Sequence, residues 1–205
     1  MVDTTSERSE RGVVSRGVEA LLPRIVEVMN VAGVPFMIAG SFATMAHGAT
    51  TDAHDLDIVI DPTPASLDRL LSSLPASSYH VDAKGAHEAL RTHGLFHVVD
   101  LATAWGIDFI VLKDRTFSRE ELKRRVTMRL HGVDVFVASA EDTLLAELEW
   151  SHNEGGSETQ RRNARGILTN AKVDLAYVER WVGELGLVNE WALVRDEAAK
   201  SMRSP

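Results

Sequence analysis

One stretch of the sequence, residues 34–61, constrains the fold more strongly than any other. It reads VPFMIAGSFATMAHGATTDAHDLDIVID. Residues 34–39 form a short apolar run that ends at Gly40, which predicts a buried strand. Residues 41–47 are mostly small or apolar and end at Gly48, as a short helix with a glycine stop does. The stretch therefore begins as a strand, a glycine turn and a short helix.

A second strand follows at residues 55–61, and it begins with two carboxylates. Polar and apolar residues alternate there in the period of a strand. Alternation places Asp55 and Asp57 on one face, about 6.5–7 Å apart along the strand, while Leu56 and Ile58 point the other way. Two carboxylates side by side repel each other unless a cation lies between them. The pair therefore predicts a divalent-metal site.

The composition is that of an ordinary globular protein, and it includes no cysteine. Of the 205 residues, 44% are hydrophobic and 25% are charged, and the formal net charge is -8. The absence of cysteine excludes disulfides, thiolate catalysis and Cys-ligated zinc. No apolar run approaches the length of a membrane span, and the first residues are polar rather than signal-like. We therefore expect a cytoplasmic protein, and its negative charge argues against a general polyanion-binding surface.

The sequence divides into a mixed part and a helical part. Residues 1–16 are polar and predict a flexible N-terminal tail. Residues 17–138 combine helical and strand periods, which predicts a mixed β-sheet of about four or five strands flanked by helices. Residues 139–205 keep a helical period and predict a helical C-terminal subdomain. The expected fold class is therefore α+β.

Further local predictions concern helix starts and the core of the helical part. Ser66 is expected to cap the helix that follows it, and Ser139 is expected to open the helix that runs to Trp150. Trp150, Trp181 and Trp191 fall at helical positions. We expect them in the core of the helical part rather than at the surface as platforms for bases.

A third acid and a phosphate-binding turn complete the candidate site. Asp108 lies in the otherwise apolar strand of residues 107–112. Three carboxylates at one sheet edge can hold one or two Mg²⁺ ions, with Mn²⁺ as the alternative metal. Gly40 lets the backbone approach a phosphate closely, and the Ser41 hydroxyl can bind its oxygens. The alternatives are acids at solvated strand ends and an ordinary turn with a serine cap.

Histidines and basic clusters are weaker candidates. His54 precedes Asp55 and is either a ligand contact or a plain loop residue. The basic clusters either contact a triphosphate or polynucleotide or form solvated helix faces; they are Lys123-Arg124-Arg125 and Arg161-Arg162 with Arg165. The sequence has no zinc-ligand spacing, P-loop, Gly-x-Gly-x-x-Gly or Gly-x-Ser-x-Gly. These absences argue against a zinc enzyme and exclude the common kinase, dinucleotide-binding and α/β-hydrolase functions.

The order of the candidate residues resembles the nucleotidyltransferase superfamily related to DNA polymerase β. That pattern is a Gly-Ser or Gly-Gly turn, an Asp-x-Asp pair on the next strand and a third acid on a later strand. Gly40-Ser41, Asp55-x-Asp57 and Asp108 match it here. From about Val34 to Trp181 the chain also resembles the small bacterial AbiEii-like branch, which includes toxins of toxin–antitoxin pairs. The stretches that carry this second resemblance are Ser118-Arg119-Glu120, Arg124-Arg125, Ala140-Glu141-Asp142 and Ser157-Glu158-x-Gln160.

The resemblance implies a nucleotidyltransferase-like sheet and a role for each matched residue. Asp55 and Asp57 would coordinate Mg²⁺ and the triphosphate. Asp108 would hold a second metal ion and help to deprotonate the acceptor hydroxyl. Gly40 and Ser41 would bind the β- and γ-phosphates.

The sequence departs from the family pattern at two basic positions. Relatives often carry a cation in the loop before the acid pair, where this chain has Thr50-Thr51, and a lysine where it has Glu147. Lys113, Arg124 and Arg125 are the residues expected to supply the missing positive charge to the nucleotide.

The implied activity is transfer of a nucleoside monophosphate from an NTP to an acceptor hydroxyl. The acceptor would be RNA such as a tRNA end, a protein or a small molecule, and the partner would be a cognate toxin or antitoxin. The alternative is a catalytically degenerate module that binds a partner protein or nucleotide without turnover. The cleft is expected between the two parts of the chain, with Arg124, Arg125 and either Arg161 or Arg162 on its far wall.

Overall fold

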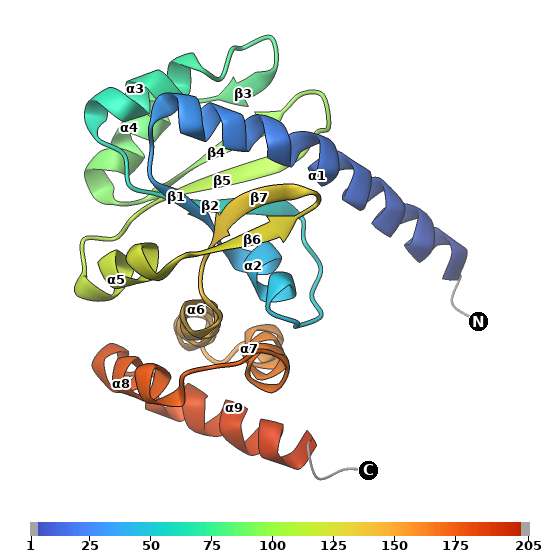
Figure 1. The fold of residues 1–205 in the computed structure, drawn as a ribbon, viewed down its shortest axis with the longest axis vertical. Helices are drawn as coiled ribbons and strands as arrows, with labels where there is room; N and C mark the ends of the chain where they lie inside the picture. Colours follow the sequence, from blue (N-terminus) through green and yellow to red (C-terminus); the bar gives the residue numbers. More distant parts are fainter. Residues whose placement is uncertain (1–3, 202–205) are drawn as a thin grey trace.

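The computed structural model describes the backbone of residues 4–201 and the side chains of residues 17–201. A mixed sheet with its covering helices forms the first part, and four helices form the second (Figure 1). The strands are β1 (Phe36–Ile38), β2 (Asp55–Ile60), β3 (Tyr79–Val81), β4 (Leu95–Asp100), β5 (Gly106–Val111), β6 (Val126–Leu130) and β7 (Val133–Val137). Their order across the sheet is β3-β4-β5-β2-β1-β7-β6.

The sheet confirms the predicted α+β class and mixed topology. β2 pairs in parallel with β5, and β1 pairs in parallel with β7. The other neighbours are antiparallel. Within residues 4–201 the sheet has seven strands rather than four or five. One of the additional strands is β3, which the sequence pattern missed because three residues at a sheet edge are too few to establish a period.

Helices cover the sheet on both faces. The helices of the first part are α1 (Thr4–Ala32), α2 (Gly40–Ala46), α3 (Pro64–Ser72), α4 (Ala83–Thr92) and α5 (Thr116–Arg124). In Figure 1, α1, α3 and α4 lie above the sheet, while α2 and α5 lie below it on the side of the helical part. The helical part consists of α6 (Ala140–Asn153), α7 (Glu158–Asn170), α8 (Leu175–Leu185) and α9 (Val188–Ser201).

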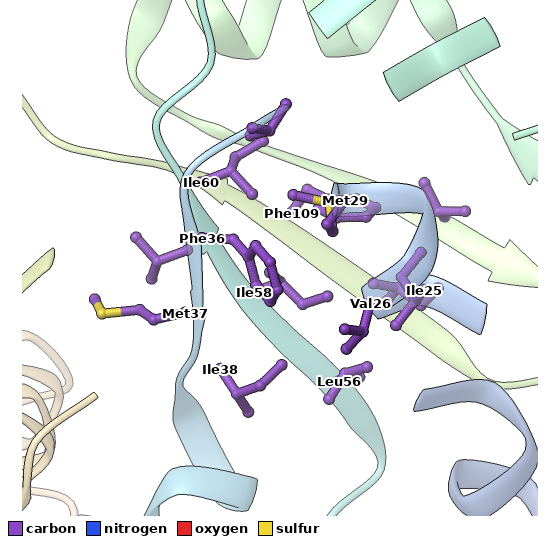
Figure 2. Close-up of a cluster of buried hydrophobic side chains, with 14 of the residues drawn as sticks. Ile25, Val26, Met29, Phe36, Met37, Ile38, Leu56, Ile58, Ile60 and Phe109 are labelled. Carbon is purple, nitrogen blue, oxygen red and sulfur yellow. The ribbon is translucent and has the colours of Figure 1, made fainter. Parts of the chain in front are cut away.

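The main core lies between α1 and the sheet. Ile25 and Met29 of α1 cluster with Leu56 and Ile58 of β2 and with Phe109 of β5 (Figure 2). All five side chains are fully buried, and burying each one contributes about 1.5–3 kcal/mol of hydrophobic free energy. Because side chains alternate along a strand, the other residues of β2 and β5 point to the opposite face of the sheet. The burial of the apolar residues of β2 and β5 against α1 thus determines that their acidic residues point to the other face of the sheet.

The predicted N-terminal tail is largely helical. α1 begins at Thr4, so residues 4–16 continue the helix that the sequence placed at residue 17, while residues 1–3 lie outside the described part. Arginine and glutamate, which are frequent there, are good helix formers, and lengthening an existing helix costs far less than starting one. Polar composition was therefore a poor guide to the backbone of this segment.

One predicted helix cap is wrong by three residues, and the other is confirmed. Thr63, not Ser66, caps α3; Ser66 is the third helical residue, and the two side chains form a reciprocal capping box. Ser139 caps α6 as expected, because its hydroxyl accepts a hydrogen bond from the backbone nitrogen of Asp142 at 3.2 Å.

The helical part has its own apolar cluster. Leu144 and Leu148 of α6 pack there with Trp181 of α8 and Trp191 of α9, which confirms the buried position of both tryptophans. Trp150 is the exception, since it is 59% exposed. None of the helices within residues 4–201 combines the length and apolar character that crossing a lipid bilayer requires.

Candidate functional site

The three predicted acids lie together at one edge of adjacent strands. Asp57 of β2 is the parallel partner of Asp108 of β5, and Asp55 is the partner of Gly106 two residues away along the strands. Asp55 and Asp57 are partly exposed, and the side chain of Asp108 is 23% exposed. The sheet register therefore brings residues more than fifty positions apart in the sequence next to each other.

Gly40 is pressed against Asp57. Its φ of 54° lies in the left-handed region, and a Cβ atom added there would lie 1.9 Å from Oδ2 of Asp57. The backbone nitrogen of Ala39 donates a hydrogen bond to the Asp57 carbonyl oxygen at 3.0 Å, which fixes the turn against β2. Both backbone conformation and space thus require glycine at this position.

The hydroxyl group of Ser41 makes no hydrogen bond within the described residues, although its Oγ atom is buried. The cap residue of α2 is Ala39, which makes no side-chain cap bond, so the alternative of Ser41 as a helix cap is wrong. A buried polar group without a partner costs free energy unless a ligand or water satisfies it.

Negative charge accumulates around Asp57. Burial, followed by the nearby charges of Asp55, Asp108 and Glu147, raises the pKa of Asp57 to about 7. A bound cation would relieve this repulsion, and carboxylate oxygens are the ligands that Mg²⁺ prefers. In the described part of the chain, no three acidic, histidine or cysteine side chains form a ready metal-binding cluster. A Mg²⁺ ion held here would therefore also need oxygens from water or substrate phosphates.

A cavity of about 570 Å³ opens beside this edge, between the sheet and the helical part. The Gly-Ser turn (Gly40 and Ser41), Asp57 and His54 line it on the sheet side, whereas Asp55 and Asp108 do not. α5, α6 and α7 form the other walls through Phe117, Glu121, Glu147, Glu149, Trp150, Gln160, Arg162 and Asn163. The exposed Trp150 thus lies on a cavity wall rather than in the core.

Comparison with solved structures identifies the fold. ANT(2")-Ia in complex with adenylyl-2"-tobramycin matches with a TM-score of 0.50 and 14% identity, covering 87% of this chain and 97% of that one. The lincosamide antibiotic adenylyltransferase LnuA, lincomycin-bound, matches with a TM-score of 0.50 and 11% identity, covering 73% and 96%. The chain has the nucleotidyltransferase fold. No protein-family model and no curated protein sequence matches it.

The resemblance to nucleotidyltransferases is thus confirmed for the fold. The AbiEii-like branch stays a prediction, as do the roles of the matched residues.

Two of the predicted nucleotide-binding cations point elsewhere. Arg124 donates hydrogen bonds to Glu141 at 3.1 Å and Asp142 at 3.4 Å, and its guanidinium lies 3.8 Å from the ring centroid of Tyr177. Arg125 donates to the carbonyl oxygen of Leu122 and lies over the ring of Phe136. Neither lines the cavity. Partners on α6 and α8 hold the Arg124 guanidinium, whereas Phe136 of β7 and a backbone carbonyl hold that of Arg125. The expected place of both arginines on the far wall of the cleft is therefore wrong, and a role in binding the nucleotide stays a prediction.

Other cations line the cavity instead. Lys113 lines it, with its Nζ atom 3.8 Å from a Glu149 oxygen, and its role in nucleotide binding stays a prediction. Arg115 forms a bidentate ion pair with Glu149 at 2.5 and 2.7 Å. Arg162 lines the cavity and has no carboxylate partner among the described residues, whereas Arg161 binds Glu158 and lies outside the lining. Sequence reasoning missed Arg115, although its place three residues before Ser118 at the start of a basic helix was a usable signal.

Glu147 stands where relatives often carry a lysine. Its carboxylate is buried on the cavity wall and accepts hydrogen bonds from the Thr44 hydroxyl at 2.6 Å and the Asn163 amide at 3.2 Å. Burial raises the pKa of Glu147, and these two hydrogen bonds oppose the rise. α2, α6 and α7 thus hold one carboxylate in place, and this wall of the cavity is acidic.

Proposed function

We propose that the protein is a Mg²⁺-dependent nucleotidyltransferase that moves a nucleoside monophosphate from an NTP to an acceptor hydroxyl. The observation that carries this proposal is the Gly-Ser turn packed against Asp57 at the cavity. The turn offers a buried hydroxyl without a partner, and its glycine keeps the backbone close to a carboxylate that needs a cation. A triphosphate with Mg²⁺ satisfies both requirements at once.

The reaction would proceed by in-line attack on the α-phosphorus. The acceptor oxygen forms a new bond to the α-phosphorus, the bond to the bridging oxygen breaks, and pyrophosphate leaves with that electron pair. Asp108 would accept the proton of the acceptor hydroxyl, and Ser41 would bind the β- and γ-phosphates. Asp55, Asp57 and Asp108 would hold Mg²⁺, or Mn²⁺. When bound, the metal supplies positive charge to the attacking and departing oxygens.

The acceptor we favour is a small, positively charged molecule. Six acidic residues line the cavity (Asp52, Asp57, Glu121, Glu147, Glu149 and Glu154), against three cations (Lys113, Arg115 and Arg162), and two of these cations already bind Glu149. Burial raises the pKa of Glu121 to about 8 and so keeps it mostly uncharged at neutral pH, but the remaining acids still outnumber the cations. An RNA end would bring more negative charge to this wall, and the whole chain already carries a formal charge of -8. The structural neighbours hold small molecules, adenylyl-2"-tobramycin and lincomycin.

A second candidate function is binding without turnover. It is favoured by the missing phosphate-binding cations, since Arg124 and Arg125 lie elsewhere and Glu147 replaces a lysine. A module of this kind would bind an NTP with Mg²⁺ but form no product. A cognate toxin or antitoxin as partner stays a prediction.

Labelled-nucleotide transfer separates these alternatives. The protein would be incubated with each of the four α-labelled NTPs, Mg²⁺ and, in separate reactions, amine-bearing small molecules, total tRNA or a cell lysate. We expect a labelled small-molecule product with at least one NTP. Asp57→Asn should abolish it, while Asp61→Asn, at the exposed far end of the same strand segment, should not. A labelled RNA or protein product would instead move the acceptor to that class, and no product with any acceptor would overturn the proposed activity.

A further inference from the structure

His97 of β4 lies directly opposite Asp108 in the sheet. The two residues are antiparallel partners, and Asp108 is in turn the parallel partner of Asp57. Side chains of directly opposed residues stand on the same face. Asp57, Asp108 and His97 therefore form a row across three neighbouring strands, β2, β5 and β4.

A short hydrogen bond joins His97 and Asp108 within this row. The Nδ1 atom of His97 lies 2.6 Å from Oδ1 of Asp108. Because an ionised carboxylate can only accept, Nδ1 carries the hydrogen and donates it. The second oxygen of Asp108, Oδ2, has no partner among residues 17–201 and is left for another ligand. About half of the His97 side chain is exposed, so the rest of the imidazole faces solvent.

Gly106 provides the space for the imidazole ring. A Cβ atom at this position would lie 2.7 Å from Cε1 of His97 and 3.5 Å from Cβ of Asp55. Glycine weakens a strand, so a glycine at the start of β5 needs a local reason, and close approach of a neighbouring group is a common one. The His97 ring of β4 therefore occupies the space that the missing side chain of Gly106 leaves on β5.

We propose that His97 is a positioning residue that fixes the carboxylate of Asp108 for its role at the nucleotide site. Hydrogen bonding of Oδ1 holds one rotamer of Asp108 and keeps Oδ2 available to the metal ion or the acceptor hydroxyl. Partners of this kind behind a metal-binding carboxylate typically change metal affinity or activity by about 10- to 100-fold when removed. The inference rests on the proposed function for its consequence, but the hydrogen bond itself can be tested without any substrate.

The first experiment uses the metal-free protein. Long-range ¹H–¹⁵N spectra of the histidine rings report which nitrogen of His97 carries the hydrogen and whether it is hydrogen-bonded. We expect the Nδ1 hydrogen of His97 to be shifted downfield, and we expect Asp108→Ala to remove that shift. A His97 spectrum that is identical in the wild type and in Asp108→Ala would overturn the proposal, whether or not the protein is a transferase.

The second experiment compares variants that differ in the donor they offer. The amide nitrogen of Asn reaches about the place of Nδ1, whereas that of Gln reaches about the place of Nε2. His97→Asn should therefore keep Mn²⁺ affinity and turnover within a few-fold of wild type, while His97→Ala and His97→Gln should lose about 10- to 100-fold in one or both. His80→Ala, at an exposed histidine of β3, is the control and should change neither.

Gly106→Ala tests the same contact without changing the imidazole. The added methyl group should displace the ring and cause a loss in the direction of His97→Ala. His97→Ala with wild-type Mn²⁺ affinity and turnover, or His97→Asn as impaired as His97→Ala in a folded protein, would overturn the positioning role. If the wild type transfers no nucleotide, the proposed function fails, and the ring spectra and Mn²⁺ affinity still decide the role of His97.

Discussion

Replacement of Gly40 by alanine gives a quantitative test of the turn that presses against Asp57. The φ of Gly40 is 54°, and the new Cβ atom would lie 1.9 Å from Oδ2, 2.6 Å from Cγ and 3.0 Å from Cβ of Asp57. Gly132→Ala is the matched control. Gly132 has a φ of 83° in the turn between β6 and β7, but nothing lies within 4 Å of its added Cβ atom.

The two variants separate the backbone cost from the steric cost. A non-glycine residue in the left-handed region costs about 1–2 kcal/mol of conformational free energy, and this cost should appear in both variants. Gly40→Ala must also displace the Asp57 side chain, and overpacking of this kind typically costs about 1–3 kcal/mol more. We therefore expect Gly132→Ala to lose about 1–2 kcal/mol of unfolding free energy and Gly40→Ala about 2–5 kcal/mol.

Urea denaturation of both variants measures this difference, and Asp57→Ala supplies the second side of a double-mutant cycle. Shortening Asp57 leaves only the 3.0 Å contact with its own Cβ atom, so Gly40→Ala should cost less in the Asp57→Ala background than in the wild type. An equal cost for Gly40→Ala and Gly132→Ala, or no coupling between positions 40 and 57, would refute the close packing of the turn against the acid.

Two further predictions concern buried groups on the cavity walls. Thr44→Val removes the hydroxyl that donates to the buried Glu147 carboxylate, and it should lower the free energy of unfolding by about 1–3 kcal/mol in urea denaturation. Thr143→Val removes a buried hydroxyl without a partner in the described chain and should leave that free energy nearly unchanged. Equal losses in the two variants would contradict the hydrogen bond between Thr44 and Glu147. Burial, followed by the charge of Asp142, raises the pKa of Glu121 from 4.5 to about 8. The folded state therefore binds the extra proton between these pH values, so this contribution to stability is complete below about pH 4.5 and is lost as the pH rises to about 8. Relative to Glu121→Gln, the wild type should lose about 1.4 kcal/mol of unfolding free energy for each pH unit between pH 5 and pH 8, and a difference that does not change with pH would contradict it.

The acids could be predicted because strand alternation is a local property. The apolar residues of β2 and β5, such as Ile58 and Phe109, must face α1, and this fixes Asp57 and Asp108 on the opposite face. Gly40 was predictable for a similar reason, because a glycine that ends a short apolar run marks a turn where the backbone can be closely approached.

Features that depend on exact register or on partners from distant elements could not be predicted. The short connection between β4 and β5 favours a hairpin, but it does not fix the register that places His97 opposite Asp108. Arg124 and Arg125 looked like free cations because their carboxylate and aromatic partners lie on other elements.

Trp150 shows the same limit for apolar residues. It falls in the helical period of α6 and was expected in the core, but it is 59% exposed on the cavity wall. A helical period identifies a face of the helix, while the neighbours of that face decide whether it meets a core or an open cavity.

The most direct test of the central claim is release of pyrophosphate. It would be measured with each NTP in the presence of Mg²⁺ and an amine-bearing hydroxyl acceptor, for the wild type, Asp57→Asn and Asp61→Asn. The proposed function predicts Mg²⁺-dependent and acceptor-dependent release by the wild type and Asp61→Asn, and release at background level by Asp57→Asn. No release by the wild type with any NTP, or equal release by Asp57→Asn, would contradict it.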